Sequence, residues 1–147
     1  MKVLIDSNVV LNKLLKQPDF FAGSNMIFTL AEIGQVANQR FDGYISASAV
    51  TDIYYIARKS LGKAAAREAI KKVLLVFSPA TVTGNDIYQA LDLEWNDFED
   101  SVQYVVGEGL AVDYIVTRNI KDFTSGSITA VTPEQFIETI TDMKAKP

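Results

Sequence analysis

The sequence predicts an α/β protein with a parallel sheet covered by helices on both faces. Its length of 147 residues suits one domain, which we expect to span residues 1–147 with a frayed polar tail at 142–147. Short apolar segments alternate along the chain with segments whose apolar residues recur at the helical period. This alternation favours parallel pairing with right-handed crossovers. The expected strands are Lys2–Ile5, Gly43–Ser46, a segment near Ser78–Pro79, Asp113–Val116 and Ser127–Val131.

Helix boundaries are marked by capping and breaking residues. Thr83 with Asp86 three residues later has the spacing of a capping box. Gly62 is expected to end the helix that follows the second strand, and Gly107 with Gly109 to end the helix after Asp97. The helices that these residues delimit place Asp97 and Asp100 at the start of the helix that precedes the fourth strand.

The third strand is the least defined element. Val73–Phe77 and Ala80–Val82 are both apolar and β-branched, on either side of Ser78–Pro79. We expect the preceding helix to run from Lys63 to about Val73 and the strand to follow, with its register left open.

A basic strip and three tyrosines allow two interpretations each. Lys63, Arg67 and Lys71 repeat every four residues on one helix face, which could hold phosphates. A solvated helix face is the favoured interpretation. Tyr54, Tyr55 and Tyr104 are expected to pack against the protein rather than stack on bases.

Composition restricts the chemistry. The chain has no cysteine and no histidine, which excludes disulfides, thiolate sites and imidazole catalysis. Carboxylates, hydroxyls, Lys, Arg or an oxygen-ligated metal remain. The net charge of −4 argues against a broadly basic coat that binds nucleic acid. The first apolar run is too short for a signal peptide, and no stretch approaches a membrane span, so we expect a soluble, cytoplasmic protein without membrane association.

Polar residues are expected to gather at one edge of the sheet. Asp6 follows the first strand, Asp52 lies near the start of the next helix, and Asp100 precedes the fourth strand, which Asn119 and Asp122 follow. Ligands of such sheets bind beyond the carboxyl ends of the strands. Gathered carboxylates repel one another unless a cation compensates. The cluster therefore suggests a site for a hard divalent cation, Mg²⁺ or Mn²⁺.

Each of these residues also has a structural interpretation. Asp97 and Asp100 could form a helix cap with its partner, Asp52 lies nearly opposite the core stripe of its helix and could face water, and Asn119 with Asp122 could cap a short turn. Asp6 is harder to explain this way, because a charge beside a buried strand needs a partner. Periodicity alone leaves both interpretations open.

Four segments resemble PIN-domain ribonucleases, a family that includes the toxins of VapC-type toxin–antitoxin pairs. Their order and spacing carry the resemblance over nearly the whole chain. The segments are VLIDSNVV at 3–10, ISASAVTDIYYIARK at 45–59, NDFEDSVQY at 96–104 and DYIVTRNIKDF at 113–123.

The resemblance implies a three-layer α/β/α sandwich with a five-stranded parallel sheet in the order 3-2-1-4-5. It implies an endoribonuclease that uses Mg²⁺ or Mn²⁺ to hydrolyse single-stranded RNA. As the toxin of a type II pair, the chain would bind a cognate antitoxin and form a homodimer. The alternative is a catalytically silent PIN-like module that binds RNA or a protein.

The resemblance also implies roles for individual residues. The catalytic residues would be Asp6, Asp52, Asp100 and Asp122. The metal ligands would be Asp6, Asp52, Asp100, Asn119 and Asp122. The substrate contacts would be Ser7, Asn8, Arg118 and Lys121.

Four positions depart from the family pattern. Asp52 stands where Glu is usual, so its carboxylate reaches one methylene less far. Asn119 lowers the negative charge of the site, and Asn12 stands where relatives often carry Asp. Ser7 replaces the usual Thr. These departures bear on metal stoichiometry more than on metal binding.

Overall fold

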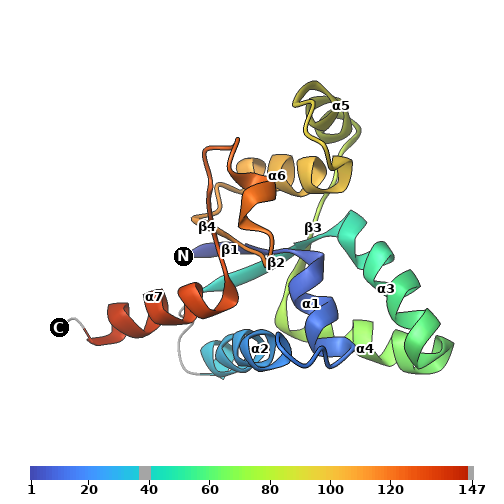
Figure 1. The fold of residues 1–147 in the computed structure, drawn as a ribbon, viewed down its shortest axis with the longest axis vertical. Helices are drawn as coiled ribbons and strands as arrows, with labels where there is room; N and C mark the ends of the chain where they lie inside the picture. The colour runs from blue at the N-terminus through green and yellow to red at the C-terminus, as the bar shows by residue number, and fades with distance from the viewer. Residues whose placement is uncertain (37–40, 146–147) are drawn as a thin grey trace.

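The chain forms a five-stranded parallel sheet in the order β3-β2-β1-β4-β5 (Figure 1). The computed structural model describes residues 1–36 and 41–145, without the side chains of 35, 36 and 143–145. The expected strand order and direction are confirmed. The strands are β1 (Lys2–Ile5), β2 (Asp42–Ser46), β3 (Ser78–Ala80), β4 (Tyr114–Val116) and β5 (Thr129–Val131).

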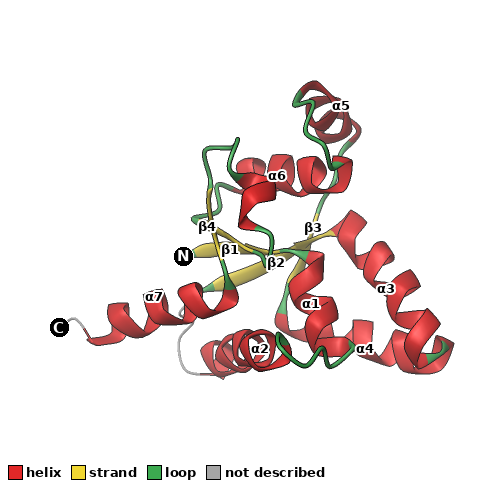
Figure 2. Cartoon of the chain, in the orientation of Figure 1, coloured by secondary structure: helices red, strands yellow, loops and turns green. Residues whose placement is uncertain are grey.

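Helices cover both faces of the sheet, which confirms the three-layer sandwich (Figure 2). Figure 1 shows α5 and α6 on one side, with α1, α2, α4 and α7 on the other. The helices are α1 (Ser7–Leu14), α2 (Phe21–Val36), α3 (Ala47–Leu61), α4 (Lys63–Val76), α5 (Gly84–Asp92), α6 (Phe98–Leu110), the 3-10 helix η1 (Ile120–Phe123) and α7 (Pro133–Ala145). None of these described helices is long and apolar enough to cross a membrane.

The central strand supplies core residues to both layers. Side chains alternate across a strand, so Val3 and Ile5 pack into the core under α1, α2 and α7, and Leu4 packs toward α6. All three are fully buried. A fully apolar strand is what a sheet covered on both faces requires.

The strand register brings the ends of β1, β4 and β5 to one edge. Ile5 pairs with Val116. One residue later, the Asp6 N–H donates to the Val116 carbonyl at 2.9 Å, and the Thr117 N–H donates to the Val131 carbonyl at 2.8 Å. Asp6 and Thr117 therefore leave the sheet side by side.

The region of the third strand differs from the expected boundaries. Val73–Val76 belong to α4, and the strand is only Ser78–Ala80. The backbone is extended at Phe77, and Ser78 precedes Pro79, a position that disfavours helical backbone, so the helix cannot resume there. Pro79 is tolerated because β3 is an edge strand.

Capping predictions are confirmed at two helices and wrong at a third terminus. Thr83 and Asp86 form the capping box of α5, with bonds of 2.9 and 3.1 Å. Gly62 caps α3 with φ of 85°. However, α6 continues through Gly107 and Gly109 to Leu110. Gly107 instead allows close packing, because a Cβ there would lie 3.3 Å from Ile128 and from Val112.

Two further expectations concern the C-terminus and the tyrosines. Residues 142–145 continue α7, and 146–147 of the expected frayed tail lie outside the described residues. Tyr104 is buried and Tyr54 is half-buried, as expected. Tyr55 is 61% exposed, so it does not belong to the core, although its ring contacts that of Tyr54 at a centroid distance of 5.5 Å.

Candidate active site

Asp6 is a buried carboxylate between the end of β1 and the start of α1, with 3% of its surface exposed. Three uncharged side chains donate hydrogen bonds to it. Thr117 Oγ1 donates to Oδ2 at 2.7 Å, Gln103 Nε2 donates to Oδ1 at 3.1 Å, and Ser7 Oγ lies 3.3 Å from Oδ1. The donors come from the residue after β4, from α6 and from α1, so three parts of the chain that meet at this edge fix one carboxylate.

Burial raises the pKa of Asp6, and the three side-chain hydrogen bonds only partly oppose that shift. Thr117 is itself held, because its hydroxyl accepts the Asn119 N–H at 3.0 Å. A buried acid fixed by neutral donors remains costly to ionise unless a cation approaches.

Asp100 lies in the first turn of α6, at the edge where Asp6 lies. The Asp97 side chain caps the helix by accepting the Asp100 N–H at 3.0 Å, as the structural interpretation expected of Asp97. Burial, then the charges of Asp6, Asp97, Asp122 and Glu99, raise the pKa of Asp100 to about 7. Every one of these neighbouring charges is negative, so the groups converge on a region of strong negative potential.

Glu99 belongs to the same cluster and was not singled out from the sequence. The Ser7 hydroxyl donates to Glu99 Oε1 at 3.1 Å. Burial raises the pKa of Glu99, followed by the charge of Asp52 and then those of Asp6 and Asp97. The signal was present in the sequence, because Glu99 lies directly between the acidic residues at 97 and 100, but the spacing of three on a helix drew attention to its neighbours.

The structure brings the four acids with expected catalytic roles to one edge. The charges of Asp6 and Asp122 both raise the pKa of Asp100. The charge of Asp52, which lies in the second turn of α3, raises the pKa of Glu99. Asn119 precedes η1 and is exposed. Its side chain makes no capping hydrogen bond in η1.

The four residues expected to contact substrate have different surroundings. Ser7 bridges Asp6 and Glu99. Asn8 accepts the Arg118 backbone N–H at 3.4 Å, and Lys121 is exposed beside Asp122. The Arg118 guanidinium pairs with Glu134, donates to a backbone carbonyl and lies over the Phe20 ring at 4.8 Å. These contacts favour a structural role for Arg118.

The donor set fits a divalent cation by its chemistry. Among residues 1–36 and 41–145, no three acidic side chains already form a metal-ligand group. Yet the pKa of Asp100 is raised by burial and by four like charges, a repulsion that a cation would offset. Carboxylate and amide oxygens suit Mg²⁺ or Mn²⁺. The residues that could hold the ion are Asp6, Asp52, Glu99, Asp100, Asn119 and Asp122.

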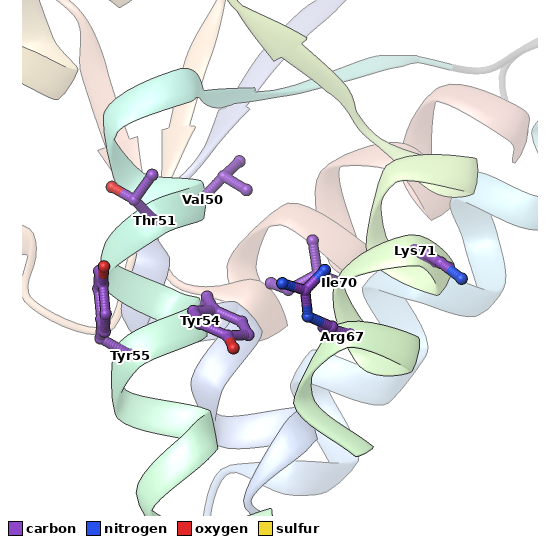
Figure 3. Close-up of a pocket in the computed structure, with 7 residues that line it drawn as sticks. All are labelled: Val50, Thr51, Tyr54, Tyr55, Arg67, Ile70 and Lys71. Atoms are coloured by element: carbon purple, nitrogen blue, oxygen red, sulfur yellow. The ribbon is translucent and has the colours of Figure 1, made fainter. Parts of the chain in front are cut away.

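A separate hollow of about 380 Å³ lies between α3 and α4 (Figure 3). Tyr54 and Arg67 border it from opposite helices. Lys71 pairs with Glu68 at 3.2 Å on the exposed surface, in agreement with a solvated helix face. None of the acidic residues described above lines this hollow.

Comparisons with known proteins define the class of this protein. The sequence model of the PIN domain matches residues 2–121, and the chain belongs to the PIN-domain family. No curated protein matches the chain by sequence.

Solved structures of similar fold include three toxins or toxin complexes. VapBC2 from Rickettsia felis, bound to a promoter DNA fragment, is 16% identical with a TM-score of 0.67, over 90% of this chain and 98% of that one. A toxin–antitoxin complex from Klebsiella pneumoniae is 18% identical with a TM-score of 0.63, over 89% and 97%. VapC20 of Mycobacterium tuberculosis, a sarcin–ricin loop cleaving toxin, is 12% identical with a TM-score of 0.64, over 84% and 95%. At these identities the likeness establishes the fold.

Proposed function

We propose that this protein is a metal-dependent endoribonuclease that hydrolyses single-stranded RNA, and the toxin of a type II toxin–antitoxin pair. The observation that carries the proposal is the cluster around Asp6 and Asp100. It combines burial, raised pKa values and neighbouring charges of one sign, in a chain of the PIN-domain family. Titratable groups perturbed in this way are typical of functional sites.

The side chains divide the work of hydrolysis. Asp6, fixed by Thr117 and Gln103, and Asp100 would hold Mg²⁺ or Mn²⁺, which when bound supplies a Lewis acid and an activated water. Glu99, whose pKa is raised and which Ser7 orients, is placed to accept the proton of the attacking water. The phosphorus–oxygen bond to the attacking water forms as the bond to the leaving ribose oxygen breaks, and that oxygen takes up a proton from solvent to become a hydroxyl.

The remaining site residues complete this proposal. Asp52, Asn119 and Asp122 would complete the surroundings of the ion, directly or through water. Ser7, Asn8 and Lys121 would contact the substrate, and the Lys121 ammonium can approach a phosphate. Arg118 would act by holding the segment after β4 in place through Glu134.

An antitoxin is the protein partner that this function requires. Two of the similar structures are toxin–antitoxin complexes. On α3 and α4 this chain exposes large apolar side chains, which a protein partner would cover. They are Tyr55, Ile56, Leu61, Leu74 and Leu75. The homodimer and the cytoplasmic location implied by the resemblance belong to the same proposal, and light scattering of the purified chain tests the dimer.

A cleavage assay tests the proposed activity. The purified chain is incubated with a structured RNA and Mn²⁺, with and without EDTA, beside Asp100→Asn. We expect cleavage by the wild type that is lost on chelation and reduced at least about a hundredfold in the variant. Full activity of the variant, or cleavage that survives EDTA, would contradict the proposal.

The second candidate is a catalytically silent PIN-like module. It is favoured by Asn12 and Asn119, which stand where a full acidic set would carry carboxylates. Calorimetry separates the candidates, because a silent scaffold should bind no Mn²⁺.

A further inference from the structure

A second hollow adjoins the carboxylate cluster. It has a volume of about 390 Å³ and lies between the segment that joins α5 to α6 and the residues around η1. Asp97 and Asp122 line it, and both raise the pKa of Asp100. A ligand in this hollow would therefore lie beside the proposed site of hydrolysis.

Trp95 supplies an aromatic wall to this hollow. It is the only tryptophan of the chain and is half-buried. Its ring is supported by Tyr104, at a centroid distance of 4.8 Å, and by Phe123 at 6.2 Å. A ring held in place by two others is preorganised to stack on a base, a contact that proteins binding single-stranded RNA commonly use.

The charges around the hollow select a base rather than a phosphate. The residues that line it include three acids and one cation. The acids are Glu94, Asp97 and Asp122, and the cation is Lys121. A phosphate would be repelled, whereas the N–H groups of a base would be attracted. Asp97 already caps α6 through Oδ1. Glu94 also lines the hollow, is exposed and directly precedes Trp95, so its carboxylate is available to accept hydrogen bonds from a base edge.

Guanine matches a carboxylate better than uracil does. It presents two N–H donors side by side on its Watson–Crick edge, which suit the two oxygens of one carboxylate. Uracil presents one N–H between two carbonyl oxygens, and these oxygens would be repelled by the oxygens of a carboxylate.

We infer that this hollow is a subsite that receives a guanine base of single-stranded RNA, stacked on Trp95 and hydrogen-bonded by Glu94. Lys121, which lines the same hollow, would contact a flanking phosphate. The inference rests on the proposed function for its substrate, and it names a base preference that the carboxylate cluster alone does not supply.

The single tryptophan allows a binding test that needs no cleavage. Trp95 fluorescence is followed while the pentanucleotide UUGUU or UUUUU is added at a fixed Ca²⁺ concentration. We expect saturable quenching by UUGUU with an affinity at least about fivefold higher than that of UUUUU, as one discriminating contact of about 1 kcal/mol gives. Equal affinity for both RNAs, or no saturable quenching, would overturn the inference.

A charge-neutral variant and a matched control test whether the preference for guanine depends on Glu94. Glu94→Gln keeps the size of an exposed side chain and removes its charge, so the two affinities should come within about twofold of each other. Glu108→Gln removes an exposed carboxylate near the other end of α6 and should leave the preference unchanged. An unchanged preference in Glu94→Gln would overturn the assigned contact.

Mapping of cleavage sites separates this inference from the proposed function. Ends produced from a mixed-sequence RNA should be enriched in guanine at one position relative to the cut, and the ends that Glu94→Gln produces should lose that enrichment. Cutting without any base enrichment would overturn the subsite alone. The absence of cutting, together with guanine-dependent quenching, would overturn the nuclease and leave the subsite.

Discussion

Asp6 is the residue on which the proposed site depends, and its neighbours determine its properties. It is buried, it is fixed by donors from three elements, and the donors carry no charge. Burial raises its pKa more than the hydrogen bonds lower it. Such a carboxylate is prepared for a cation, because the donors already fix its orientation.

Gln103 allows this positioning to be tested. Its Nε2 donates to Asp6, and its buried Oε1 has no hydrogen-bond partner. Gln103→Met keeps the approximate volume and removes the donor. We expect a stability change within about 1 kcal/mol, because an unpaired acceptor is removed as well. Mn²⁺ affinity should fall roughly tenfold, as loss of a residue that orients a ligand does.

Calorimetry with Mn²⁺ and urea denaturation in EDTA measure these two effects separately. An unchanged Mn²⁺ affinity would show that Gln103 does not position Asp6. A large loss of stability would show that its amide is needed by the fold instead.

Asp100 predicts an unusual dependence of stability on pH in the metal-free protein. Its pKa is about 7 in the folded state against 3.8 for the ordinary group, so folding favours its protonated form. Ionisation of Asp100 therefore lowers the free energy of unfolding. This loss of stability is absent below pH 3.8, grows as the pH rises to 7, and is complete above pH 7. Asp100→Asn removes that loss.

The variant should therefore be more stable than the wild type in EDTA at pH 8. The gain should be roughly 1–2 kcal/mol after solvent screening of this half-exposed carboxyl is allowed for, and it should shrink by pH 5. Urea denaturation at both values measures it. A gain equal at both pH values would show that the charge of Asp100 is not the cause.

At the scale of elements, the loop between η1 and β5 is held against α6. A Cβ at Gly126 would clash with the Tyr104 ring, whose three nearest atoms would lie at 2.9 Å or closer. The same ring supports Trp95. The packing of this loop thus determines the position of the wall of the proposed base subsite.

Two glycines give a matched pair of predictions. Gly126→Ala should destabilise the protein by about 1–3 kcal/mol, because the Tyr104 ring must move. Gly109 lies inside α6 with open space around its Cβ position, so Gly109→Ala should stabilise by up to about 1 kcal/mol. Guanidinium denaturation compares both with the wild type, and effects of equal sign would contradict the packing described.

Most helices were predictable from local patterns, and the order of the strands followed from the resemblance to PIN-domain ribonucleases, but two features were not predictable. Val73 and Val76 are apolar and β-branched, which fits a strand equally well, and only the structure shows that α4 continues through them. Glu99 and Gln103 lie on one face of α6. They contact Ser7 and Asp6, respectively, which are more than 90 residues away in the sequence. Periodicity reports a face of a helix, and only the assembled sheet shows what that face meets.

At the scale of the whole molecule, negative charge and the proposed RNA substrate must be reconciled. The net charge is −4, and acids gather at the edge of the sheet. Phosphates would be repelled there without a cation. The sequence was sufficient to predict which edge carries the acids, since strand ends define it, whereas the depth of burial of Asp6 required the complete fold.

The central claim is that the acids at this edge hold a divalent cation, and calorimetric titration with Mn²⁺ tests it most directly. We expect the wild type and Asp92→Asn, which changes an exposed acid at the end of α5, to bind with the same affinity. Asp100→Asn should bind at least about tenfold more weakly. Equal binding by all three proteins, or none by the wild type, would contradict the claim.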